Sequence, residues 1–154
     1  IVPAMENLQA VIAESKSSPQ AIPGKVSLVG FSVGGAGVLA YGTKLKEQVS
    51  AVVAYYPAIT TLGRDMKTLA AGFQTPVLVF AGEEDRYHNC CLIESMRDLA
   101  KAPKSVPFEL VEHPGAHHGF DIKSLPFAYR PEDAADSWAR TVAFLNRFHP
   151  PRGK

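Results

Sequence analysis

The chain has 154 residues, of which 46% are hydrophobic and 20% are charged. This length suits one domain with its own core, residues 1–154, and is too short for two, while the apolar content excludes a disordered linker protein. No apolar run approaches ~18 residues, which argues against a membrane partner. The 16 basic and 15 acidic residues give a formal net charge of +1, and no basic block favours nucleic acid as a partner.

The sequence contains two cysteines, Cys90 and Cys91, which are neighbours. Adjacent cysteines rarely bridge to each other because the local geometry is strained, so we expect two reduced side chains packed in the interior. This usage favours a reducing, cytoplasmic location. The chain opens on Ile1, with no initiator methionine and no targeting segment, which leaves open that it is a piece of a longer protein.

Helices and short apolar strands alternate along the chain. In chain order we expect a helix at 2–16, a strand at 26–30, a helix ending near 47, a strand at 49–56, a weak helix at 64–71, a strand at 76–81, a helix at 89–101, a strand at 106–111 and a helix after 131. Their predicted buried stripes are Met5, Leu8 and Ile12; Leu92, Met96 and Leu99; and Ala134, Trp138, Val142 (or Thr141) and Leu145. Strands that are apolar throughout and separated by helices indicate a parallel sheet covered on both faces.

The segment from Gly30 to Gly34 has the form Gly-x-Ser-x-Gly and lies between a predicted strand and a predicted helix. A nucleophile in that place sits on a tight turn, and glycine on either side lets the two segments approach. Ser32 would then stand above the carboxyl end of the sheet. The backbone N–H of Val33, at the start of the helix, could donate to a developing oxyanion.

A serine nucleophile needs a base and a group that orients the base, which in this type of fold follow in the order serine, acid, histidine. Asp85 comes directly after the third predicted strand, and His117 and His118 lie in the loop after the fourth. Because the carboxyl ends of parallel strands meet at one rim, all of these side chains are expected beside Ser32.

Four segments resemble the dienelactone hydrolase family of α/β-hydrolases, over about residues 5–148. They are Gly-Phe-Ser-Val-Gly-Gly, Val-Leu-Val-Phe-Ala-Gly-Glu-Glu-Asp, His-Pro-Gly-Ala-His-His-Gly-Phe and Ala-Ala-Asp-Ser-Trp-Ala-Arg-Thr-Val-Ala-Phe-Leu. The resemblance implies an α/β-hydrolase-type, mostly parallel sheet flanked by helices. It implies Ser32 as nucleophile, Asp85 as acid and His118 as base, with His117 on a variable position. The implied reaction hydrolyses a small ester or lactone and needs neither a metal nor an organic cofactor.

One departure from the family concerns the nucleophile, because dienelactone hydrolases proper have cysteine where this chain has Ser32. Serine depends on its base more than cysteine does, so a broader ester substrate is expected rather than a specific lactone. Lys123 and Arg130 lie in the region where the family's lactonases hold a substrate carboxylate, and a solvated charge is the alternative for both.

A second departure is that only one helix precedes the predicted nucleophile strand, where the family has several strands. Those strands and the loop with the second oxyanion donor are missing, so we expect either a fragment or a truncated paralogue. A paralogue that lost turnover would be a non-catalytic binding or assembly module. An unpaired strand edge promotes association, so we expect Val26–Val29 to pair with polypeptide outside these 154 residues, from another chain or a missing N-terminal segment.

Overall fold

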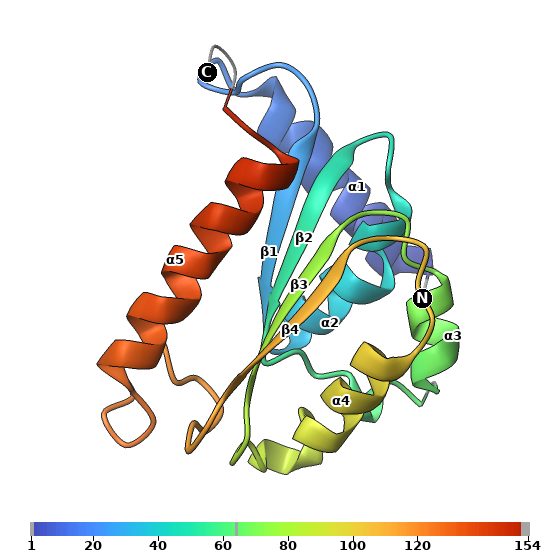
Figure 1. Ribbon diagram of the computed structural model, residues 1–154. Helices are drawn as coiled ribbons and strands as arrows, with labels where there is room; N and C mark the ends of the chain where they lie inside the picture. Colours follow the sequence, from blue (N-terminus) through green and yellow to red (C-terminus); the bar gives the residue numbers. More distant parts are fainter. Residues whose placement is uncertain (1, 64, 152–154) are drawn as a thin grey trace.

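A computed structural model describes residues 2–63 and 65–151 and shows a four-stranded parallel sheet flanked by helices (Figure 1). The strands, in the spatial order β1-β2-β3-β4, are β1 (Val26–Phe31), β2 (Val49–Tyr55), β3 (Val77–Gly82) and β4 (Phe108–His113). The α-helices are α1 (Val2–Ser17), α2 (Val33–Ala40), α3 (Met66–Ala71), α4 (Ile93–Lys101) and α5 (Pro131–Phe148). Short 3₁₀ turns cover Gly42–Lys44, Thr60–Leu62 and Tyr87–Asn89. The predicted parallel sheet and the alternation of strands and helices are confirmed.

The sheet separates two apolar cores. Helices α1, α2, α3 and α4 cover one face and α5 covers the other (Figure 1). The larger core lies on the four-helix side and includes Ile12 of α1, whereas Tyr55 and Phe80 belong to the core beneath α5. Burial on both faces explains why β2 and β3 are apolar at almost every position.

The strand register brings the carboxyl ends of the strands to one rim. Phe31 at the end of β1 pairs with Tyr55, which in turn pairs with Phe80 of β3. Gly82 at the end of β3 pairs with His113 at the end of β4. The loops that follow β1, β3 and β4 therefore leave the sheet side by side, as the fold requires of the predicted site.

The first strand is less buried than its apolar sequence predicts. Within the described residues β1 pairs only with β2, so it forms an edge of the sheet. Val29 is 37% exposed and Phe31 44% exposed. The prediction of a buried strand here is wrong for this chain by itself, because a strand with a neighbour along one edge leaves its side chains partly open to solvent.

Two helices are shorter than predicted. Helix α2 ends at Ala40 rather than near residue 47, and a 3₁₀ turn follows at Gly42–Lys44. Helix α4 begins at Ile93 rather than at residue 89, because Asn89 has a positive φ of 53° and Leu92 is extended (φ −65°, ψ 137°), and a helix accommodates neither. Helix α3 begins at Met66; Arg64, where the prediction began it, lies outside the described residues.

The buried face of α5 is rotated by about one residue from the predicted stripe. Trp138 is 60% exposed and Val142 42% exposed, whereas Ser137, Thr141 and Phe144 are buried. Thr141, the alternative that helical spacing allowed, forms a hydrogen bond of 2.8 Å with the hydroxyl of Tyr55. A buried polar contact with the sheet thus fixes the orientation of α5, and hydrophobic spacing does not show it.

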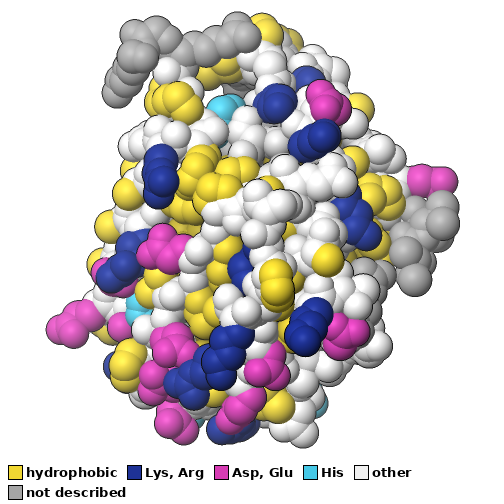
Figure 2. Space-filling model, turned by 45° about the vertical axis from the view of Figure 1, so that its right-hand side comes forward, with side chains coloured by type: hydrophobic (Ala, Val, Ile, Leu, Met, Phe, Trp, Pro, Cys, Tyr) yellow, Lys and Arg dark blue, Asp and Glu magenta, His cyan; other side chains and the backbone are white. Residues whose placement is uncertain are grey.

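The surface has no dominant charge on the side shown in Figure 2, where described basic and acidic side chains are intermixed among apolar ones. No described helix is both long enough and apolar enough to cross a bilayer.

Candidate active site

Ser32 occupies a sharp turn between β1 and α2. Its φ of 53° and ψ of −116° are unusual for a residue with a side chain. The backbone around it is fixed by hydrogen bonds from the Ser32 N–H to the Tyr55 carbonyl (3.0 Å) and from the Ala58 N–H to the Ser32 carbonyl (2.9 Å). A turn held in this way presents the hydroxyl at the rim of the sheet.

Gly30 makes this turn possible. A Cβ atom at position 30 would lie 2.4 Å from the carbonyl oxygen of Gly34 and 2.8 Å from a methyl carbon of Val38. Strand and helix therefore approach too closely for any side chain at this position. A Cβ at Gly34 would meet nothing within 4 Å. Crowding by other residues of this chain therefore explains the glycine at position 30 but not the glycine at position 34.

Asp85 is held in the loop that follows β3. Its side chain is buried, and one carboxylate oxygen, Oδ1, accepts a hydrogen bond of 3.1 Å from the backbone N–H of Tyr87. Gly82 lets the neighbouring loop approach, because a Cβ there would lie 2.3 Å from the carbonyl oxygen of Ala116. The loop that contains Ala116 also carries His118, so this close contact brings acid and histidine together.

His118 bridges the other two side chains. Its Nδ1 lies 2.8 Å from Oδ2 of Asp85, and its Nε2 lies 2.9 Å from Oγ of Ser32. An ionised carboxylate only accepts hydrogen bonds, so Nδ1 carries the proton toward Asp85 and Nε2 is left to accept one from the serine hydroxyl. This is the arrangement of a nucleophile, a base and a group that orients the base.

Two aromatic rings that the sequence analysis did not select hold the imidazole of His118. The ring of Tyr87 stacks on it at a centroid distance of 4.8 Å and an interplanar angle of 12°, and the ring of Tyr56 lies 4.6 Å away. Tyr56 directly follows β2, so its place at the same rim was available from the sequence. The packing of the Tyr56 ring against the imidazole depends on the loop after β4, which carries His118.

Tyr56 is itself fixed by Asp121, whose Oδ1 accepts a hydrogen bond of 2.7 Å from the tyrosine hydroxyl. Burial and the adjacent Asp121 carboxylate raise the pKa of Tyr56. The hydroxyl therefore stays protonated and remains a donor.

The contacts with Ser32 and Asp85 are made by His118 and not by the alternative histidine, His117. His117, Glu84 and Glu83 are exposed or half-buried, and Glu83 lies 3.6 Å from the guanidinium of Arg97. Arg130 pairs with Asp133, and its guanidinium also donates to the carbonyls of Pro114 and Gly115. A substrate carboxylate would compete with these contacts for Arg130.

The two cysteines differ from the prediction. Cys90 and Cys91 form a disulfide with each other, between the 3₁₀ turn and α4. The expectation of two reduced side chains is wrong here, and it was the basis for predicting a cytoplasmic location. Both side chains are buried, as predicted.

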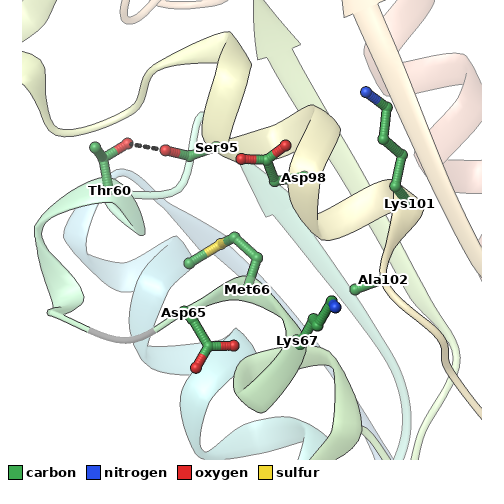
Figure 3. Close-up of a pocket in the computed structure, with 8 residues that line it drawn as sticks. All are labelled: Thr60, Asp65, Met66, Lys67, Ser95, Asp98, Lys101 and Ala102. Carbon is green, nitrogen blue, oxygen red and sulfur yellow. Dashed lines mark hydrogen bonds between the residues drawn. The ribbon is translucent and has the colours of Figure 1, made fainter.

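Two concave regions are compared as substrate sites. A cleft of about 300 Å³ opens beside the imidazole, and its lining residues are Arg86, Tyr87, His117, His118 and Phe127. A second cavity of about 550 Å³ lies between α3 and α4 (Figure 3), lined by Thr60, Asp65, Met66, Lys67, Ser95, Asp98, Lys101 and Ala102. Several of its polar groups have partners, since Thr60 donates to Ser95 and Asp65 caps α3. The cleft beside His118 is therefore the candidate substrate site.

Comparison with known proteins gives one consistent family. The model of the dienelactone hydrolase family matches residues 3–149. A protein of Methylorubrum extorquens named carboxymethylenebutenolidase is 28% identical over 149 residues, which cover 94% of this chain and 50% of that protein. A protein of the same name from Aquifex aeolicus is 24% identical over 144 residues, covering 91% of this chain and 58% of that protein.

Solved structures show the same fold. A dienelactone hydrolase from Klebsiella pneumoniae superposes with a TM-score of 0.78 at 22% identity, over 94% of this chain and 60% of that one. A dienelactone hydrolase-like promiscuous phosphotriesterase from metagenomic libraries gives 0.76 at 21% identity, over 94% and 61%. The fold is of the α/β-hydrolase type, and this chain spans about half to three fifths of the length of these relatives.

Proposed function

Because this chain belongs to the dienelactone hydrolase family, we propose that it hydrolyses a carboxylic ester or lactone through an acyl-enzyme formed on Ser32. The observation that carries the proposal is the position of His118, whose two ring nitrogens lie 2.9 Å from the Ser32 hydroxyl and 2.8 Å from the Asp85 carboxylate. A family likeness at this level of identity supports hydrolysis in general. The contacts of His118 support a serine mechanism in particular.

In the first half of the reaction, His118 Nε2 takes the hydroxyl proton as Ser32 Oγ attacks the carbonyl carbon. Asp85 holds the protonated imidazole in place and stabilises its charge. The tetrahedral intermediate carries a negative oxygen, and we assign the backbone N–H of Val33, at the start of α2, as one donor to it. The intermediate collapses when His118 returns the proton to the leaving alkoxide, which leaves an acyl group on Ser32.

In the second half, water enters and the roles repeat. His118 takes a proton from the water, whose oxygen attacks the acyl carbon, and then gives that proton back to Ser32 Oγ. The acid product leaves and the hydroxyl is restored. No step needs a metal or an organic cofactor.

The cleft beside His118 favours an ester with an apolar or aromatic group. Tyr87 and Phe127 contribute aromatic surface, and Phe127 is 85% exposed. The nearby cation of Arg86 pairs with Glu94, and Arg130 is engaged with Asp133. We therefore propose a broad ester substrate rather than an anionic lactone held by arginine.

A partner polypeptide or a further segment of the same protein is part of the proposal. β1 forms the edge of the sheet, and Val29, Phe31 and Val33 are exposed next to Ser32. An edge strand with apolar neighbours pairs readily with another strand. We propose that polypeptide outside these residues pairs with Val26–Val29, covers this patch and brings the second oxyanion donor to Ser32.

A serine-directed phosphonate tests the mechanism. We expect one covalent adduct per chain, located on Ser32 by peptide mass spectrometry, and a loss of labelling in His118→Ala but not in His117→Ala. Labelling at another residue, or equal labelling of both variants, would contradict the proposal.

The second candidate is a binding or assembly module that keeps the fold without turnover. It is favoured by the exposure of Val33, at 76%, and of Phe31 beside the serine, because an open site does not exclude water or surround a substrate. Binding of a substrate-like ester without any release of acid or alcohol, in protein that includes whatever polypeptide pairs β1, would favour this candidate.

A further inference from the structure

Cys90 and Cys91 lie close to Asp85 and His118 of the candidate active site. They follow the turn that carries Tyr87, and the Cys90 N–H donates to the Tyr87 carbonyl at 3.0 Å. The Cys90 carbonyl accepts a bond of 2.9 Å from the Thr60 N–H. Both cysteine side chains are buried. The backbone thus anchors the pair next to the residue whose ring stacks on His118.

The sulfur atoms share a small volume with the acid and the base. One ligand atom from each of Asp85, Cys90, Cys91 and His118 lies within 4.8 Å of the others, and three of the four residues are buried. Two sulfurs, one imidazole nitrogen and one carboxylate oxygen match the ligands that zinc prefers. Tetrahedral zinc places such atoms about 3.3–3.8 Å apart, so side-chain rotation of the freed thiols is the main adjustment required.

We propose that reduction of the Cys90–Cys91 disulfide creates a site for a thiophilic divalent cation, formed by both cysteines, His118 and Asp85. A second part of the proposal, which rests on the proposed function, is that the bound cation inhibits hydrolysis. The disulfide keeps the two sulfurs bonded to each other and therefore unable to bind the ion as thiolates.

The chemistry of this step balances with a phosphine as reductant. The phosphine supplies an electron pair that breaks the Sγ–Sγ bond, and it leaves as the phosphine oxide with its oxygen taken from water. The two protons of that water end on the two sulfurs. Binding of the cation then releases two protons, because thiolates rather than thiols are the ligands.

Inhibition follows from the contacts of His118. One ring nitrogen faces Asp85 and the other faces Ser32. A cation that binds either nitrogen therefore displaces one of the two contacts on which the base depends. Two thiolates and a carboxylate around a divalent ion leave a net charge of −1, so the ion offsets the charge of the two thiolates that its binding creates.

The test uses Co²⁺ as the probe, because tetrahedral thiolate coordination gives it visible and ultraviolet absorption bands that do not depend on activity. The purified protein is reduced anaerobically with a phosphine, freed of reductant and titrated with Co²⁺, and Zn²⁺ is then added in competition. We expect one Co²⁺ per chain in the reduced protein, displaced by Zn²⁺, and none in the oxidised protein. Cys90→Ser/Cys91→Ser should lose binding, His118→Ala and Asp85→Asn should bind at least about tenfold more weakly, and His117→Ala should bind normally.

Each of three results would overturn one part of the proposal. Equal Co²⁺ binding by the reduced protein and by Cys90→Ser/Cys91→Ser would overturn the site. Full affinity in both His118→Ala and Asp85→Asn would overturn the four-residue ligand set. Undiminished ester hydrolysis with the ion bound would overturn inhibition. A protein that hydrolyses no ester would contradict the proposed function, while the Co²⁺ spectra would still decide the cation site.

Discussion

The two sides of the candidate site differ in how much of their surroundings this chain supplies. On one side Asp85 and His118 are held by Tyr87 and Tyr56, through a backbone hydrogen bond to the carboxylate and two rings against the imidazole. On the other side Ser32 stands beside the edge of the sheet, with Val33 76% exposed. Among the described residues, nearby loops surround Asp85 and His118, whereas Val33 beside Ser32 stays exposed. Local loops can therefore position a carboxylate and an imidazole, whereas we propose that the surroundings of Ser32 depend on polypeptide outside these residues.

Among the variants of the two sides, His118→Ala is expected to have the largest effect on turnover. Without the base, turnover should fall by on the order of 10⁶, as for other residues that act as one unit with a serine nucleophile. His117→Ala is the matched control, because its side chain is exposed and lies outside the three-residue contact. Initial rates with a chromogenic ester measure both. Full activity in His118→Ala with loss in His117→Ala would move the base to His117.

Asp85→Asn should reduce turnover by about 10⁴, because an amide at this position favours the wrong tautomer of His118. Glu84→Gln, one residue earlier and exposed, should leave the rate nearly unchanged. Circular dichroism of both variants checks that the fold is intact. The reverse order of rates would assign the orienting carboxylate to Glu84.

The exposed surroundings of Ser32 predict that turnover depends on polypeptide outside these residues. We expect turnover to rise by about 10²–10³ when a segment or partner that pairs β1 supplies the second oxyanion donor. Hydrogen exchange checks the cause, since amides of Val26–Val29 that point away from β2 should become protected at the same time. A rate and an exchange pattern unchanged by any such polypeptide would show that the nucleophile side is complete already.

The turn at the nucleophile should be sensitive to a single methyl group. Gly30→Ala places Cβ against the Gly34 carbonyl and should lower the free energy of unfolding by about 1–3 kcal/mol. Gly37→Ala, in the same helix region, meets nothing within 4 Å and should change it by about 1 kcal/mol or less, in the stabilising direction. Urea denaturation compares the two, and equal losses would contradict a steric role for Gly30.

The smallest effect is expected from the hydroxyl of Tyr56. Tyr56→Phe keeps the ring against His118 and removes the bond to Asp121, which should cost about 1 kcal/mol of unfolding free energy and less than about tenfold in turnover. Tyr56→Leu, which also removes the ring, should lower turnover further at similar KM. Equal rates in the two variants would show that the ring does not position the imidazole.

The sequence determined the features that depend on local pattern. Alternating apolar strands and helices predicted the parallel sheet. The glycines and serine at 30–34, followed by Asp85 and by His117 or His118 after later strands, predicted which loops meet at its rim, and the family resemblance selected His118. The sheet is confirmed, and the three side chains lie together because parallel strands bring their carboxyl ends to one edge of the sheet.

Only the tertiary structure decided what depends on contacts between distant segments. It fixed the buried face of α5 through Thr141 and Tyr55 rather than through Trp138, and it brought Tyr56 and Tyr87 against His118. It also left β1 at the edge of the sheet and joined Cys90 to Cys91. The physical reason is common to all four. Spacing along the chain constrains which residues share a face, whereas the partner that each face meets is set by packing in three dimensions.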